Sequence, residues 1–329
     1  GVANMAEYHY DDGAVYGFPT KYENSRWILI NEDMFKEAGL DIPYDGWTYS
    51  EFLADAEKLT HGEDQDKVYG VCWARKQSGK SILYALDGVL GANQIYKNEE
   101  GTEVNFDNDV YRAGFNLVKE TLDKGYAIPI EDEFSEDISV ANTFLQGKCA
   151  IMLGVAQMRL CMDQENYPHD FTTALVPAPV PDDEKYNTEF YRKQIGTTGA
   201  GDLLSISANT KYPEASFEFA MWYLKGGMSP LVQGGRIPLW NGVNKDEVLS
   251  VLKEKAQGSI DMDSMENYLS LDTTQGVAAI KGHASSEISS AWFEEFDAMC
   301  YGKQSVDQTV QNMEKRGNEL IQTELSSQK

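Results

Sequence analysis

Short apolar runs alternate along this chain with segments that carry helix-start signals, and this alternation limits the fold more than any other feature. Asn31 precedes an amphipathic stretch, and Thr48 with Glu51 forms a capping-box pattern. Four runs have the length and composition of buried strands: residues 27–30, 68–73, 150–153 and 171–176. Strands that alternate with helices predict an α/β fold, rather than a β-sandwich or a helical bundle.

The rest of the chain carries further helix signals. We expect helices at residues 32–38, 79–92, 107–122, 138–145 and 213–224, and a short strand at 203–206. Trp222 lies on the apolar face of its helix and is expected to be a core residue. Ser305 and Gln308 form a second capping-box pattern, which predicts the start of a long amphipathic C-terminal helix.

Length and charge restrict the organisation and the partners. A single core stops growing near roughly 250–300 residues, so 329 residues predict two lobes. Lys and Arg total 28 and Asp and Glu total 53, which gives a net charge of −25. A surface this acidic repels phosphate backbones and anionic headgroups, so neither nucleic acid nor an anionic membrane surface is an expected partner.

Searches for catalytic and cofactor motifs fail. Gly79-Lys80-Ser81 resembles the end of a phosphate-binding loop, but Ala74 stands where the first glycine is required. Asp261 begins a segment like a calcium loop, but Glu266 occupies the position that needs glycine. The four histidines are scattered, and no spacing singles out a pair among the 53 carboxylates. We therefore expect neither cofactor nor metal.

The four cysteines show no pattern that fixes their state. Cys72, Cys149, Cys161 and Cys300 form no CxxC pair and no dense framework. The simplest expectation is four scattered thiols, mostly buried. A bridge between Cys149 and Cys161 is the alternative.

Aromatic side chains are the remaining chemical signal. Trp73, Trp240 and Trp292 stand near predicted loops and are candidates for exposed platforms. Flat aromatic faces suit the apolar faces of sugar rings, while amide, guanidinium and carboxylate groups suit their hydroxyl edges. A core position is the competing interpretation for each tryptophan.

Seven motifs stand in one order along nearly the whole chain. They are DGAVYGFP at 12–19, NEDMFKEAGL at 31–40, GWTYSEF at 46–52, FLQGKCAIM with Gly154 at 144–154, PEASFEF at 213–219, GRIP at 235–238 and GKQSVDQ at 302–308. In this order the chain resembles the extracellular solute-binding proteins of ABC importers, in the carbohydrate-binding family that includes maltose-binding protein.

The resemblance implies a periplasmic-binding-protein-like class II fold. Two α/β lobes are joined by crossings near residues 19–22 and 195–202 and close over the solute by a hinge motion. The implied division is 1–20, a remnant of lobe 1; 21–195, lobe 2; 196–245, lobe 1 continued; and 246–329, a return to lobe 2 with C-terminal helices. Relatives carry further residues before the first motif, so we expect lobe 1 to be incomplete here and the parent protein to be longer.

The resemblance also implies a ligand-binding set. Its members are Tyr22, Glu23, Asn24, Trp73, Arg75, Gln157, Arg159, Trp240 and Trp292. Relatives often carry a stacking tryptophan just after the position of Gly154. This chain has Val155, Ala156 and Gln157 there instead, which leaves the class of sugar open.

The resemblance implies that the protein binds and transports a solute and catalyses no reaction. The expected ligand is a carbohydrate of oligosaccharide size, which a monomeric protein delivers to the permease subunits of an ABC importer. The expected location is the outer face of the membrane, as a lipoprotein, or the periplasm. Two alternatives stay open: a binding protein for a peptide or polyamine, which the net charge allows, and a secreted glycoside-processing enzyme.

Overall fold

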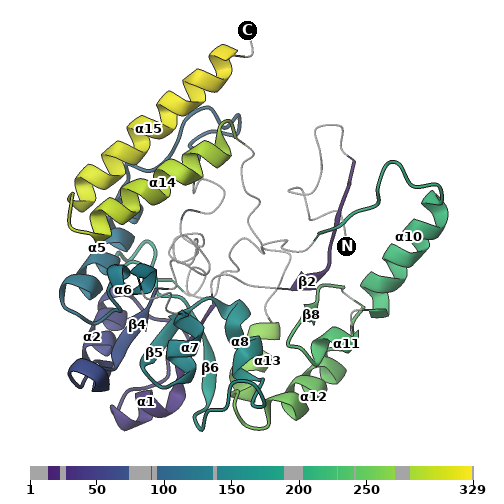
Figure 1. Cartoon of the computed structure of the whole chain (residues 1–329), viewed down its shortest axis with the longest axis horizontal. Coiled ribbons are helices and arrows are strands. Elements are labelled where there is room, and N and C mark those ends of the chain that lie inside the picture. Colours follow the sequence, from purple (N-terminus) through teal and green to yellow (C-terminus); the bar gives the residue numbers. More distant parts are fainter. Residues whose placement is uncertain are drawn as a thin grey trace.

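The computed structural model describes residues 14–22, 27–73, 90, 95–135, 139–188, 203–227, 229–240, 242–270 and 282–327 (Figure 1). The predicted helix at 79–92 therefore lies outside the described residues, apart from position 90. The predicted crossing at 195–202 lies outside them as well.

A four-stranded mixed sheet forms the centre of the fold. Its strands are β3 (Trp27–Asn31), β4 (Tyr69–Cys72), β5 (Cys149–Leu153) and β6 (Thr173–Pro177), and all four confirm predicted strands. Their order is β4-β5-β3-β6. β4 runs parallel to β5, whereas β3 is antiparallel to both β5 and β6.

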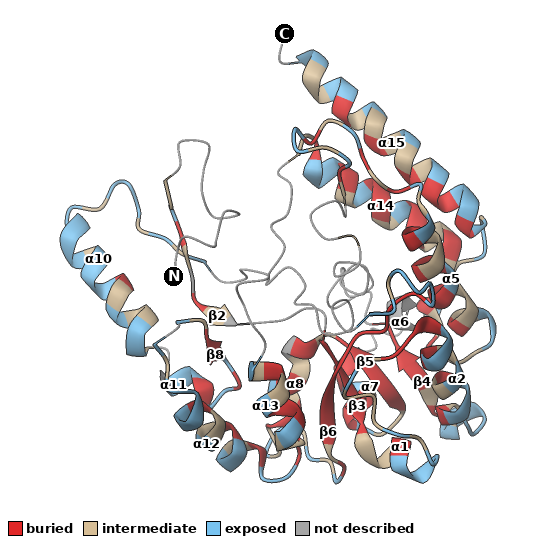
Figure 2. Cartoon of the chain, turned by 180° about the vertical axis from the view of Figure 1, so that it is seen from behind, coloured by how far each residue is buried: buried red, intermediate tan, exposed pale blue. Residues whose placement is uncertain are grey.

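Helices cover both faces of this sheet, because successive side chains of a strand point to opposite faces. Ile28 and Ile30 belong to one buried cluster, and Trp27 and Leu29 belong to the other. The first cluster takes in α1 (Glu32–Glu37), α2 (Tyr49–Leu59), α5 (Asp109–Asp123), α14 (Ser285–Cys300) and α15 (Val306–Ser327). The second takes in α7 (Val140–Leu145), α8 (Met158–Cys161), α12 (Lys245–Ala256) and α13 (Met262–Ser270). Figure 2 shows the buried residues of this layered α/β body in red.

Side-chain caps fix the helix starts that the sequence predicts. The Asn31 side chain accepts a hydrogen bond from the Met34 amide at 3.1 Å and so caps α1. The capping box of α2 forms in full, with the Thr48 hydroxyl and the Glu51 carboxylate bonding each other's backbone amides. In α15 the Ser305 hydroxyl accepts from the Gln308 amide at 3.2 Å. The Gln308 side chain donates a hydrogen bond to Asn312 and does not bond back to the Ser305 amide, so only half of that predicted box forms.

Two short strand pairs lie away from the main sheet. β1 (Phe18–Pro19) pairs with β7 (Leu203–Leu204), and β2 (Lys21–Tyr22) pairs with β8 (Ile237–Pro238), both antiparallel. One extended segment, residues 18–22, therefore changes partner between Pro19 and Lys21. The remaining short elements are η3 (Asp64–Asp66), α6 (Ile130–Ser135), η5 (Val155–Gln157), η6 (Tyr223–Gly227) and α11 (Ser229–Val232).

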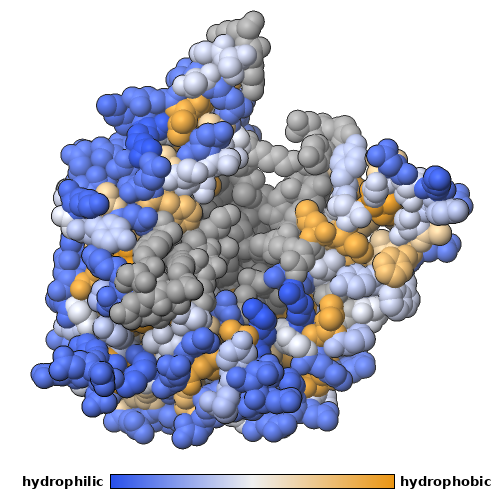
Figure 3. Space-filling model, viewed as in Figure 1, coloured by the Kyte–Doolittle hydropathy of each residue, from blue (hydrophilic) through white to orange (hydrophobic). Residues whose placement is uncertain are grey.

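Helix α10 (Pro213–Trp222) exposes apolar side chains. Trp222 is 61% exposed, and Phe217 and Phe219 are exposed too, so the expectation that Trp222 is a core residue is wrong. Apolar residues lie all round this helix, so one side of it can be covered while apolar side chains on the other sides stay exposed. Figure 3 shows the resulting apolar surface, in orange, on and beside α10.

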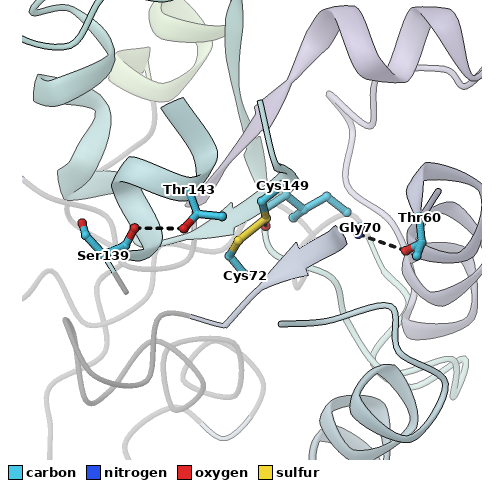
Figure 4. Close-up of a disulfide and its surroundings, with 7 residues drawn as sticks. Thr60, Gly70, Cys72, Ser139, Thr143 and Cys149 are labelled. Carbon is cyan, nitrogen blue, oxygen red and sulfur yellow. Dashed lines mark hydrogen bonds between the residues drawn. A yellow bond between two sulfur atoms is a disulfide. The ribbon is translucent and has the colours of Figure 1, made fainter. Parts of the chain in front are cut away.

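A disulfide joins Cys72 on β4 to Cys149 on β5 (Figure 4). Cys161, which is buried, and Cys300 take no part in this disulfide. Both sequence expectations are therefore wrong: the chain does not carry four thiols, and the partner of Cys149 is not Cys161. The reason is the sheet, because the parallel pairing of β4 with β5 brings together two residues that are 77 positions apart.

Replacing both bridged cysteines, Cys72→Ala with Cys149→Ala, should lower the free energy of unfolding by about 2–4 kcal/mol. Removing the crosslink frees a long loop in the unfolded chain. Urea denaturation measures the change, with Cys300→Ala as the control. Alkylation of the denatured, unreduced protein should label two thiols, and labelling of all four would contradict the bridge.

Asp55 on α2 generates a prediction about pH. Burial, together with the charges of Glu51 and Asp41, raises the pKa of this carboxyl from 3.8 to about 6, and Lys58 opposes the shift. The folded protein therefore holds the Asp55 proton more tightly than the unfolded chain does. This contribution to stability is complete below pH 4 and is lost as the pH rises through 6.

Asp55→Asn should therefore stabilise the protein at pH 7.5, by on the order of 1 kcal/mol for a half-buried carboxyl, and should have little effect at pH 4. Thermal unfolding at both pH values measures this difference. Glu63→Gln, at an exposed position in the loop after α2, is the control. A gain of equal size at both pH values would contradict the prediction.

Candidate functional site

Three of the segments expected to bind ligand reach the same edge of the main sheet. Trp27 lies opposite Pro177, Ile28 lies opposite Leu153, and Cys72 lies opposite Met152. The start of β3 and the ends of β4, β5 and β6 therefore meet at one edge, which we call the carboxyl edge. In open α/β sheets, ligands bind outside the carboxyl ends of the strands.

The polar candidates that the structure describes follow β5 or lie in β2. Gln157 ends η5, directly after β5, and is half-buried, while Arg159 on α8 is exposed. Tyr22 lies in β2, opposite Ile237 of β8. Glu23, Asn24 and Arg75 lie outside the described residues. Gln157 and Arg159 offer an amide and a guanidinium, which suit the hydroxyl groups of a polar solute.

Trp73 is a core residue and not an exposed platform. Only 4% of it is exposed, and its Nε1 donates a hydrogen bond to the Thr121 hydroxyl at 2.8 Å. Its ring lies 5.8 Å from that of Phe52, between centroids. The cause is strand alternation: Trp73 continues β4 on the face that α2 and α5 cover, as Val71 does.

Trp292 is also packed in the core, so the expectation that it is exposed is wrong. It is 3% exposed and stacks on Phe296 with centroids 5.0 Å apart and planes 6° apart. The edge contact with Phe115 of α5 has centroids 5.7 Å apart. Residues four apart share one side of a helix, so Trp292 and Phe296 form the buried side of α14. Within the described part of the chain, Trp292 Nε1 has no hydrogen-bond partner.

Trp240 differs from the other two tryptophan candidates because it is 41% exposed. It follows β8. The Lys225 ammonium lies 5.6 Å from its ring centroid, and the backbone of Gly242 packs against its Nε1 edge. Neighbouring groups therefore hold the ring, and it still offers aromatic surface to a ligand.

Neither a metal cluster nor a membrane-spanning helix is found in the part of the chain that the structure describes. There, no three His, Cys, Asp or Glu side chains come close enough together to hold a metal ion. None of the described helices combines the length and the apolar character needed to cross a bilayer.

Comparison with known families decides the assignment. The family model of bacterial extracellular solute-binding proteins matches residues 2–225, which is more than half of the chain. The protein belongs to this family. Its members are solute-binding proteins and not enzymes, so the alternative of a glycoside-processing enzyme is set aside.

Solved structures of similar fold support the architecture of this solute-binding protein. A sugar transporter from Rhizobium etli in an open conformation superposes with a TM-score of 0.67 at 17% identity, over 98% of this chain and 76% of that one. An ABC substrate-binding protein from Listeria monocytogenes in complex with cycloalternan gives 0.67 at 18% identity, over 97% and 75%. A cyclic α-maltosyl-1,6-maltose binding protein from Arthrobacter globiformis gives 0.66 at 15% identity, over 98% and 76%. The expected periplasmic-binding-protein-like fold is confirmed.

The tryptophans generate a stability prediction. Trp73→Ala and Trp292→Ala should each lower the free energy of unfolding by about 3–5 kcal/mol, because each leaves a large cavity in the core. Trp240→Ala should cost about 1 kcal/mol or less, because much of that ring is already in water. Urea denaturation ranks the three variants, and a larger loss for Trp240→Ala than for the other two would contradict the burial described above.

Proposed function

We propose that this solute-binding protein binds a carbohydrate of oligosaccharide size at the carboxyl edge and delivers it to the permease subunits of an ABC importer. The family match is the observation that carries the proposal. The convergence of the strand ends of β4, β5 and β6 at one edge supports the location of the site.

The chemistry of three candidate side chains suits a sugar. Trp240 offers an aromatic face, and Gln157 and Arg159 offer hydrogen-bonding groups, the combination that sugar rings require. One of the similar proteins was solved in complex with cycloalternan, and another is a cyclic α-maltosyl-1,6-maltose binding protein. Both of these ligands are cyclic oligosaccharides. The ligand-binding roles of Tyr22, Glu23, Asn24, Trp73, Arg75 and Trp292 belong to the same proposal. For Trp73 and Trp292, burial in the core argues against direct contact.

The proposal extends to the lobes and the location. We assign residues 21–195 and 246–329 to lobe 2 and residues 1–20 and 196–228 to lobe 1, with the solute bound between them. Residues 229–245, which the sequence division places in lobe 1, are assigned to lobe 2 instead, because Val232 and Ile237 lie in its buried cluster. The family is extracellular, and the Cys72–Cys149 bridge suits an oxidising compartment. We propose a monomer that acts as a membrane-anchored lipoprotein or free in the periplasm.

A screen of ligands by thermal unfolding tests this function. The panel contains maltotriose, cycloalternan, cellotriose, mannitol, spermidine and a tripeptide. A sugar at 100 times its dissociation constant stabilises the folded state by about 2.7 kcal/mol, which corresponds to a rise of roughly 5 °C. A response to spermidine or the tripeptide, with none to any sugar, would overturn the proposal in favour of the cationic or peptide solute that the charge of −25 allows.

Arg159→Ala should weaken sugar binding by about 10- to 100-fold, because a charge-assisted hydrogen bond is lost. The side chain is exposed, so the unfolding temperature without sugar should change little. Isothermal titration calorimetry measures the affinity, with Lys315→Ala, an exposed cation on α15, as the control. Equal affinity in the two variants would remove Arg159 from the site.

A further inference from the structure

The turn between α11 and β8 packs directly on α8. Gly235 lies in this turn, is buried, and has φ +76°, in the left-handed region that favours glycine. Its amide donates to the Val232 carbonyl at 2.8 Å, and the Arg236 amide donates to the Leu231 carbonyl at 3.1 Å. These two bonds form a Schellman motif that ends α11 and directs the chain into β8.

Gly235 also has no room for a side chain. A Cβ added there would lie 2.6 Å from Met162 Cε, 2.9 Å from Arg159 Cβ and 3.0 Å from Arg159 Cα. The Met162 side chain can move aside, but the backbone of α8 at Arg159 cannot do so without shifting. Only glycine permits this approach of the turn to α8.

Buried side chains hold the turn on both sides of Gly235. Val232 before it and Ile237 after it belong to the same buried cluster as Met158 and Met162 of the α8 region. Ile237 in turn pairs with Tyr22 of β2, and the next residues along the chain are the expected ligand-binding positions 23 and 24. Tyr22 and residues 157–159, all expected to bind solute, therefore belong to elements that meet at this turn.

We propose that Gly235 is a positioning residue of the solute site: its contact with α8 holds α8 and the β2–β8 pair together as one rigid body. The part of this inference that concerns solute rests on the proposed function. The contact keeps Gln157 and Arg159 in a fixed relation to the β2–β8 pair, in which Tyr22 lies opposite Ile237. These elements then meet the solute as one preformed surface, which reduces the ordering cost of binding.

Gly39 provides a matched control, because it forms the same motif in open space. Its amide donates to the Lys36 carbonyl at 3.0 Å, and the Leu40 amide donates to the Phe35 carbonyl at 2.9 Å. Its φ is +67°, and an added Cβ would meet nothing within 4 Å. Gly39→Ala and Gly235→Ala therefore share the backbone strain, and only Gly235→Ala pushes on a neighbouring element.

Hydrogen exchange of backbone amides, measured without any ligand, tests the rigid body. Gly235→Ala should accelerate exchange at least 10-fold both in residues 155–162 and in the β2–β8 pair, whereas Gly39→Ala should leave these segments unchanged. If Gly235→Ala does not fold, Met162→Ala removes the contact from the α8 side and should accelerate exchange in the same two segments. Exchange that equals that of the Gly39→Ala control would overturn the proposal.

Binding of maltotriose, or of the panel sugar with the largest thermal shift, provides the second readout. The dissociation constant should rise at least 10-fold in Gly235→Ala relative to Gly39→Ala. Equal constants, with accelerated exchange, would show a structural contact that does not position the site and would overturn the inference. If the unchanged protein binds no sugar, the proposed function fails, and the exchange experiment still decides whether the rigid body exists.

Discussion

Burial of the four-stranded sheet on both faces is the constraint on which the rest of the structure depends. Ile28 and Ile30 pack toward one helical layer and Trp27 and Leu29 toward the other, so no face of β3 is left in water. The same alternation carries Val71 and Trp73 into the first layer and Cys72 into the second. Once both layers are filled, polar groups that face solvent are left to the ends of the strands, and Gln157 and Arg159, which we propose bind the solute, follow the end of β5.

Local features of the fold were predictable from the sequence because their causes are local. A cap such as Asn31 and a box such as Thr48 with Glu51 act within one turn of helix. The four strands were predictable because runs that are apolar at every position suit strands buried on both faces. The α/β class follows from these elements alone.

Burial of individual side chains and pairing between distant segments were not predictable in the same way. Trp73 and Trp292 are apolar residues near predicted loops, and the sequence cannot tell which of these face a neighbouring helix. Trp222 was expected in the core and is exposed. A helix that is apolar all round has no sequence pattern that identifies its buried side. The Cys72–Cys149 bridge and the contact of Gly235 with Arg159 depend on tertiary packing, although GRIP at 235–238 was among the motifs that carry the family resemblance.

The partner change within residues 18–22 has a mechanical consequence. Pro19 is tied to β7 and Lys21 to β8, and the Thr20 carbonyl between them accepts a hydrogen bond from the Leu239 amide at 3.3 Å. Any load that passes along this segment between the β1–β7 pair and the β2–β8 pair therefore runs through the backbone of Thr20. A twist at Thr20 would leave the hydrogen bonds of both strand pairs in place.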